Sequence, residues 1–138
     1  MREMIYTNQR TIPEILDSGN INGYEYRIIS YGTHPCAYIA LPKTHKLYSS
    51  YRNLYRNPIL KVHGNITYIN NILLIGKTRQ RNHWIGWDYS SYGDYTGNNN
   101  DETKKKWKVS EILNETQFVI KQLEKCDKRK EISNEKCV

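Results

Sequence analysis

The side chains best suited to chemistry are concentrated in one short segment, Trp84–Tyr95, where tryptophan, tyrosine, aspartate and glycine follow one another closely. Indole and phenol rings stack on planar rings such as nucleobases, and a carboxylate accepts hydrogen bonds from ribose hydroxyls. Glycines allow tight turns and the close approach of a ligand to the backbone. This composition indicates a pocket for a nucleotide-like ligand. Its candidate binding residues in this segment are Trp84, Trp87, Asp88, Tyr89, Asp94 and Tyr95.

The same segment also allows a purely structural interpretation. The tryptophans would then belong to the hydrophobic core, and the aspartates would cap backbone amides of the following loop. In the ligand-binding interpretation a tryptophan or Tyr89 stacks on a base, while Asp88 and Asp94 hold ribose hydroxyls.

A second candidate segment is His63–Thr67, where a strand is expected to open at Gly64. A histidine at that point serves as a general acid or base, as a hydrogen-bond donor to phosphate, or as a group that orients a ligand. Arg79 or Arg81 would add positive charge near the phosphate. The candidate binding residues outside Trp84–Tyr95 are His34, which precedes a proline in a turn, and His63, Asn65 and Thr67.

These residues would also suit an enzyme, in which His63 is the general acid or base and Asp88 or Asp94 positions a water molecule. Binding without turnover is the interpretation that we favour. The histidines lack the spacing of a metal-binding helix, and the chain has no Cys-x-x-Cys pair, glycine-rich phosphate loop or nucleophile elbow. We therefore expect neither a metal nor a cofactor, and Cys36 is expected to be a small hydrophobic residue on a strand.

The 138 residues carry a formal net charge of +7, which favours an anionic partner. Nucleic acid ranks last among such partners, because much of the excess lies in Lys104–Lys108 and in the acid-containing stretch Lys121–Lys136. The longest nearly apolar runs, such as Ile69–Gly76, are shorter than the ~20 residues of a membrane span. No secretory signal is readable in Met1–Arg10. A cytoplasmic location and no membrane partner are therefore expected.

Hydrophobic periodicity predicts an α+β fold with a small, mostly antiparallel sheet. Thr11–Glu14 resembles a capping box with a proline in the first turn, which predicts a short N-terminal helix that ends by Gly19. Asn20–Gly23 predicts a turn. Strands are predicted at Tyr24–Tyr31, Cys36–Leu41, Ile59–Val62, Ile66–Ile69, Leu73–Ile75 and His83–Tyr89.

The last part of the chain changes to a 3.6-residue period after a Ser90–Thr103 loop. From Val109 this period predicts one amphipathic helix that packs on the sheet. Its apolar face consists of Ile112, Leu113, Thr116, Val119, Ile120 and Leu123. Lys43–Pro58 fits either a short helix or an ordered surface loop. We expect a single domain over residues 1–125 and a charged, disordered tail over residues 126–138.

Four blocks of the sequence together resemble a family of small proteins from bacteriophages and prophages of low-GC Gram-positive bacteria. The blocks are Gly32–Tyr38, His63–Tyr68, Trp84–Tyr95 and Lys106-Trp107, and the resemblance extends over roughly Tyr24–Leu123. In that family the second block reads His-Gly-Gly-Leu/Ile-Thr, and the third continues Gly-Trp-Asp-x-Ala-His-x-Gly-Asp. In this chain Asn65 replaces the second glycine and Ser90-Ser91 replaces Ala-His, while Lys108 stands where a capping threonine is usual.

The resemblance implies a phage protein that antagonises host defence inside the bacterial cell. Joined to the pocket composition, it leads us to expect the sequestration of a nucleotide-derived immune signal, such as a cyclic nucleotide or an ADP-ribose derivative. The histidine lost at Ser91 favours binding over an enzyme that degrades the signal. A third hypothesis is an inhibitor that binds a host defence protein through its tyrosine-rich segment Tyr48–Tyr55. A homodimer or larger assembly is expected, because ligand-capturing phage proteins are frequently oligomers, and two subunits can complete one pocket.

Overall fold

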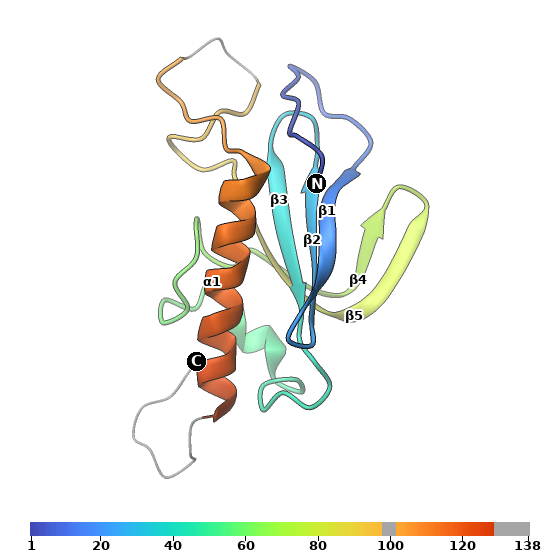
Figure 1. Cartoon of the computed structure of the whole chain (residues 1–138), viewed down its shortest axis with the longest axis vertical. Coiled ribbons are helices and arrows are strands. Elements are labelled where there is room, and N and C mark those ends of the chain that lie inside the picture. The colour runs from blue at the N-terminus through green and yellow to red at the C-terminus, as the bar shows by residue number, and fades with distance from the viewer. Residues whose placement is uncertain (98–101, 129–138) are drawn as a thin grey trace.

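The computed structural model of the protein describes residues 1–97 and 102–128. Over these residues five strands form one antiparallel sheet in the order β1-β2-β3-β5-β4. The strands are β1 (Glu14–Ile21), β2 (Tyr24–Ser30), β3 (Pro35–Ala40), β4 (Tyr68–Ile75) and β5 (Thr78–Asp88). A long helix, α1 (Val109–Lys128), lies across the sheet (Figure 1). The predicted α+β class is confirmed.

The predicted N-terminal helix is wrong, because residues 14–21 form the edge strand β1. β1 pairs with β2 through a turn at Asn22 and Gly23, which have φ angles of 54° and 92°. Positive φ at both positions is typical of the two-residue hairpin turn whose twist matches that of the strands. The hydrogen bonds of the whole hairpin outweigh the weak local signal of one capping box. The turn predicted at Asn20–Gly23 is confirmed.

The strands predicted at Tyr24–Tyr31, Cys36–Leu41 and His83–Tyr89 correspond to β2, β3 and β5. β5 begins already at Thr78, because it pairs along its length with β4. Of the two short strands predicted at either side of Asn70, Leu73–Ile75 and the second half of Ile66–Ile69 belong to the single strand β4, which begins at Tyr68. Its pairing with β5 is interrupted by a bulge between Asn70 and Ile72. The bulge hides the continuity of β4, because it shifts the alternation of apolar residues by one position.

Residues 59–62, predicted as a strand, are not one. Their backbone pairs instead with a side chain of α1: the Lys61 N–H donates to Gln122 Oε1, and Gln122 Nε2 donates to the Lys61 carbonyl, both at 2.7 Å. An amide side chain can replace a neighbouring strand in this way, because it offers one donor and one acceptor. The segment before it contains a short 3-10 helix, η1 (Tyr51–Leu54), between turns.

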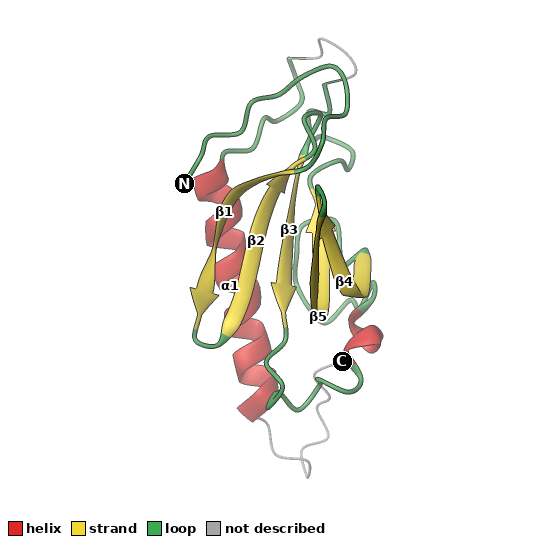
Figure 2. Ribbon diagram, turned by 90° about the vertical axis from the view of Figure 1, so that its right-hand side faces the viewer, coloured by secondary structure: helices red, strands yellow, loops and turns green. Residues whose placement is uncertain are grey.

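Helix α1 covers one face of the sheet over the β1–β3 half, as the turned view shows (Figure 2). Its buried residues are Val109, Ile112, Thr116, Val119, Ile120, Leu123 and Cys126, which confirms the predicted apolar face apart from the half-buried Leu113. The helix continues to Lys128, so residues 126–128 of the predicted tail are helical. Residues 129–138 of that tail, and 98–101 of the predicted loop, lie outside the described residues. Within the described chain no helix is long and apolar enough to cross a membrane.

The opposite face of the sheet carries a second, smaller hydrophobic cluster. It contains Ile29, Cys36, Tyr38, Ala40, Leu73, Ile75 and Trp84. The part of the β4–β5 hairpin near its turn contributes Leu73 and Ile75 to this cluster. Gln80 of the same hairpin accepts a 3.0 Å hydrogen bond from Arg27 of β2. Because strands two places apart in the sheet touch in this way, the sheet must curl toward this face. Cys36 is a buried core residue there, as predicted.

Candidate functional site

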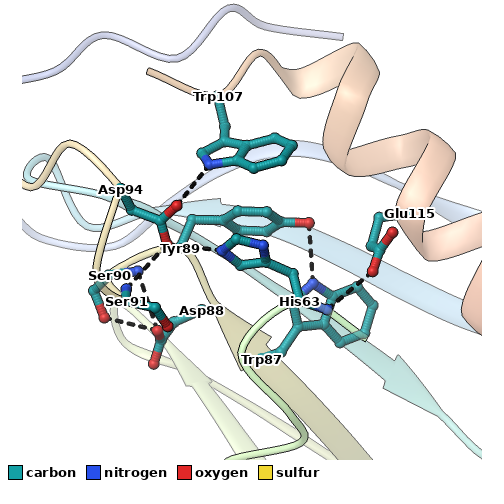
Figure 3. A network of polar contacts seen from close by, with 9 residues as sticks. All are labelled: His63, Trp87, Asp88, Tyr89, Ser90, Ser91, Asp94, Trp107 and Glu115. Carbon is teal, nitrogen blue, oxygen red and sulfur yellow. Dashed lines mark hydrogen bonds and ion pairs between the residues drawn. The ribbon is translucent and has the colours of Figure 1, made fainter. Parts of the chain in front are cut away.

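His63 and Asp94 meet in a polar network beyond the C-terminal end of β5 (Figure 3). The distance between His63 Nε2 and Asp94 Oδ2 is 2.8 Å. An ionised carboxylate only accepts hydrogen bonds, so Nε2 carries the proton that joins the two side chains. Two of the residues singled out in the sequence, from segments 31 positions apart, are therefore direct neighbours.

The Asp94 carboxylate is almost fully buried, with 3% of the side chain exposed. Its Oδ1 accepts a hydrogen bond from Trp107 Nε1 at 2.8 Å. Its Oδ2 accepts the Ser91 backbone N–H at 2.9 Å in addition to His63. Both carboxylate oxygens are thus occupied by donors of the protein itself. Asp94 thereby positions His63, Trp107 and the Ser91 loop, and the contact with a ribose or a water molecule stays a prediction.

The imidazole of His63 is held between aromatic rings. It lies nearly parallel to the Tyr89 ring, with a centroid distance of 4.5 Å and an interplanar angle of 13°. Trp107 contacts it edge-on at 4.9 Å. A quarter of the side chain, 24%, is exposed. Since Nε2 is bonded to Asp94, the nitrogen that remains for a ligand is Nδ1, which lies close to the histidine's own backbone.

The loop that carries His63 is shaped by two residues in the left-handed region. Gly64 has a φ of 65° and Asn65 a φ of 68°. Glycine adopts this conformation freely and asparagine tolerates it better than most residues. A Cβ on Gly64 would lie 2.8 Å from Ser91 Oγ. The His63 N–H donates to Glu115 Oε1 of α1 at 2.9 Å, which fixes the loop from the other side.

The three aromatic side chains expected to stack on a base are buried. Trp84, Trp87 and Tyr89 are 1%, 1% and 0% exposed. Trp87 Nε1 donates to the Tyr89 hydroxyl at 3.1 Å inside the main core, whereas Trp84 belongs to the cluster on the opposite face of the sheet. Burial raises the pKa of Tyr89, which keeps its hydroxyl neutral. The structure therefore supports the core interpretation of these three residues.

Asp88 has hydrogen-bond partners different from those of Asp94. Its Oδ1 accepts hydrogen bonds from the Ser90 hydroxyl at 2.7 Å and from the Ser90 N–H at 3.2 Å. Such a bond to the residue two positions ahead shapes the start of a loop. The two aspartates serve different protein partners, as Figure 3 shows, and a shared ribose-binding role for them stays a prediction.

The remaining predicted residues outside the network have bonds that lead elsewhere. His34 Nδ1 lies 2.9 Å from Thr33 Oγ1, and burial lowers the pKa of His34. Asn65 and Thr67 are exposed. Their backbone amides donate to the carbonyls of the 62–67 turn and of β5.

Tyr95, another predicted residue, contacts the N-terminal segment. It meets Tyr6 edge-on with a centroid distance of 5.5 Å, and the Tyr6 hydroxyl donates to the Trp107 carbonyl at 3.0 Å. These contacts tie the N-terminal segment to the residues before α1, which lie together in both views (Figures 1 and 2). Between them is a groove of about 540 Å³. Its lining includes Arg2, Glu3, Tyr6, Lys106, Trp107 and Lys108.

Sequence reasoning missed most of this lining, because Arg2 and Tyr6 are far along the chain from Trp107 and carry no motif. The one available signal was the Lys106-Trp107 block of the family resemblance. Arg79, expected to meet a phosphate beside His63, instead lines a separate recess of about 440 Å³.

The tyrosine-rich segment proposed as a protein interface is largely packed. Tyr48 and Tyr51 stack on either side of His83, with centroid distances of 3.7 and 4.2 Å. Tyr51 is 4% exposed, and Tyr55 is the tyrosine of this segment that is exposed, at 50%.

Comparisons with protein-family models, with curated proteins and with solved structures found no match. The class of the protein is therefore defined by its fold and site: an antiparallel five-stranded sheet with one covering helix and a basic, aromatic groove beside a histidine–aspartate pair. Over residues 1–97 and 102–128 no group of three or more His, Cys, Asp or Glu side chains is placed to hold a metal ion. Function must be argued from the site, since a fold alone does not define one.

Proposed function

We propose that this protein binds and sequesters an anionic, nucleotide-derived small molecule in the groove between its N-terminal segment and the start of α1. The volume of about 540 Å³ falls within the range of small-molecule sites. Following the family resemblance, we propose further that the ligand is an immune signal of a host bacterium, such as a cyclic nucleotide or an ADP-ribose derivative. The protein would then be a phage anti-defence factor that acts in the host cytoplasm.

The observation that carries this proposal is the combination of cations and rings in the groove. Lys106 and Lys108 supply positive charge, as does Arg2, whose guanidinium also lies 3.4 Å from the Glu14 carboxylate. Tyr6 and Trp107 supply ring surface. Phosphate is attracted to such cations, and a base stacks on such rings. The first turn of α1 also lines the groove, and the positive end of the helix dipole lies there.

The Trp107 ring is held in place before any ligand arrives. Its Nε1 is bonded to the buried Asp94 carboxylate, and its edge contacts the His63 ring. Lys105 Nζ lies 3.9 Å from the centroid of the same indole. A side chain that is already ordered loses little entropy on binding, so the network behind the groove favours affinity. This assigns His63 and Asp94 a supporting role instead of direct ligand contact.

Capture without turnover fits this geometry better than catalysis does. A general base needs a nitrogen or carboxylate that reaches the substrate. His63 Nε2, the ring nitrogen farther from the backbone, and both oxygens of Asp94 are already bonded within the protein.

The test uses purified protein incubated with ADP-ribose and, separately, with cyclic di-AMP. The mixture is passed through a filter that retains protein, and the filtrate and the heat-denatured protein are analysed by mass spectrometry. Sequestration predicts that a nucleotide leaves the filtrate and returns from the protein with unchanged mass. The double variant Arg2→Gln/Lys108→Gln should lower retention, whereas Lys77→Gln, in the exposed β4–β5 turn, should not. If neither nucleotide is depleted, the proposal is wrong.

An enzyme that degrades the same signal is the second candidate, and the 2.8 Å His63–Asp94 contact favours it. A carboxylate that orients an imidazole is a recurring element of general-base catalysis. In the same experiment an enzyme would release fragments of the nucleotide. Replacement of His63 by alanine would then stop fragmentation while intact nucleotide remained on the protein.

A further inference from the structure

We infer that the binding site has two lobes and that its ligand consists of two nucleoside-like halves joined through phosphate. The inference rests on the proposed function, since it narrows the class of ligand for the same site. It comes from a second groove, of about 530 Å³, that adjoins the first. The second groove is lined by Tyr95, Glu102, Lys104 and Lys106.

Each lobe contains the same three kinds of side chain. The first lobe has Tyr6 with Trp107 as rings, Glu3 as a carboxylate and Lys108 as a cation. In the second lobe the corresponding residues are Tyr95, Glu102 and Lys104. A ring stacks on a base, a carboxylate accepts hydrogen bonds from the two ribose hydroxyls, and an ammonium group binds phosphate. Each lobe is thus equipped for one nucleoside phosphate.

Lys106 lines both grooves and is the residue at which the lobes meet. Its Nζ lies 4.6 Å from the centroid of the Tyr95 ring. A phosphate group that links two nucleosides would occupy this junction, where a cation serves both halves. A ligand with a single ring would use one lobe and leave the other open.

The three consecutive lysines, Lys104–Lys106, have different partners. Lys105 N–H donates to the Gly93 carbonyl and the Tyr95 N–H donates to the Lys105 carbonyl, both at 2.8 Å. In an extended strand successive side chains point to opposite sides. Lys105 accordingly pairs with Glu111 at 2.8 Å, while Lys104 and Lys106 line the second groove. Two of the three consecutive lysines therefore line the second groove.

Titration calorimetry with AMP, cyclic di-AMP and linear diadenosine diphosphate tests the inference. We expect one dinucleotide per chain, bound at least about tenfold more tightly than AMP, because the second half binds from a high effective concentration. AMP should occupy both lobes weakly, at two per chain. Glu102→Gln should reduce the AMP stoichiometry to one and bring dinucleotide affinity toward that of AMP. Glu3→Gln should act in the same way on the other lobe.

Lys106→Gln should lower the affinity for dinucleotides by about tenfold or more, which is the scale of one lost charge-assisted contact. It should lower the affinity for AMP by less. Lys77→Gln is the matched control and should change neither affinity. One AMP per chain, bound as tightly as the dinucleotides, would overturn the two-lobed site and leave the proposed function standing. Absence of binding by all three compounds and by ADP-ribose would overturn the proposed function together with the inference.

Discussion

The His63 imidazole donates to the Asp94 carboxylate at 2.8 Å, and through this contact the His63 loop is fastened to the Ser91–Tyr95 loop. Asp94 is 3% exposed and serves three donors at once. Replacement by asparagine removes the charge and one acceptor, so a buried donor loses its partner. We expect Asp94→Asn to lower the free energy of unfolding by about 2–3 kcal/mol, measured by urea denaturation.

The matched control for this change is Asp88→Asn. Asp88 is half-buried and, among the side chains drawn in Figure 3, bonds only its neighbour Ser90. The expected loss is below about 1 kcal/mol, as for an ordinary surface substitution. Equal losses in the two variants would show that the Asp94 network does not stabilise the fold.

A substitution at Gly64 tests how closely the His63 loop approaches the Ser91 loop. Its φ of 65° strains any other residue, and an added Cβ would lie 2.8 Å from Ser91 Oγ. Gly64→Ala should cost about 1–3 kcal/mol of unfolding free energy. Gly76→Ala has a similar φ of 60° but nothing within 4 Å, so it measures the backbone part alone. The difference between them should shrink in a Ser91→Ala background, and an unchanged difference would rule out the contact as its cause.

Alkaline pH should destabilise the protein through its buried tyrosines. Burial first, and then the hydrogen bond and charge of Asp17, raise the pKa of Tyr26 from 10.0 to about 12. The folded state thus holds the phenol proton more tightly than the unfolded state does. The resulting stability is complete below pH 10 and is lost as the pH rises toward 12. Urea midpoints measured across this range should fall, and less steeply in Tyr26→Phe. A parallel fall in that variant would exclude Tyr26 as a contributor.

Fluorescence quenching should distinguish the half-buried tryptophan from the two buried ones. Trp84 and Trp87 are 1% exposed, whereas Trp107 is half-buried beside the groove. Acrylamide is expected to quench Trp107 preferentially, and the quenchable emission should disappear in Trp107→Phe. A bound nucleotide should protect this emission from acrylamide. Strong quenching that persists in Trp107→Phe would contradict the burial of the other two rings.

Periodic features were readable from the sequence because they depend on neighbours along the chain. The apolar residues of α1 recur every three or four positions, so the helix and its buried face follow from the pattern alone. β2 and β3 follow from runs of residues that favour strands, and the first hairpin turn from Asn22-Gly23. The helix predicted at Thr11–Glu14 failed because β1 is stabilised by pairing with β2, which a local capping signal does not register.

The composition of Trp84–Tyr95 likewise singled out this segment, but the rings that were expected to stack on a base are buried. Alternation along β5 sends Trp84 to one face of the sheet and Trp87 to the other, and burial on both faces removes the rings from solvent. His63 and Asp94 were both candidate residues, but their mutual bond depends on two loops that meet in space and is not readable from the sequence.

By itself, then, the sequence determined an α+β chain with one amphipathic C-terminal helix, a positive charge and a histidine and an aspartate worth attention. Tertiary structure alone decided that Asp94 accepts hydrogen bonds from Trp107, Ser91 and His63, and that residues of the N-terminal segment and of the start of α1 border one groove. The physical reason is that hydrogen-bond saturation and groove lining are properties of distances between remote segments. Those distances are set by the packing of the sheet, the helix and the N-terminal segment, which no local pattern encodes.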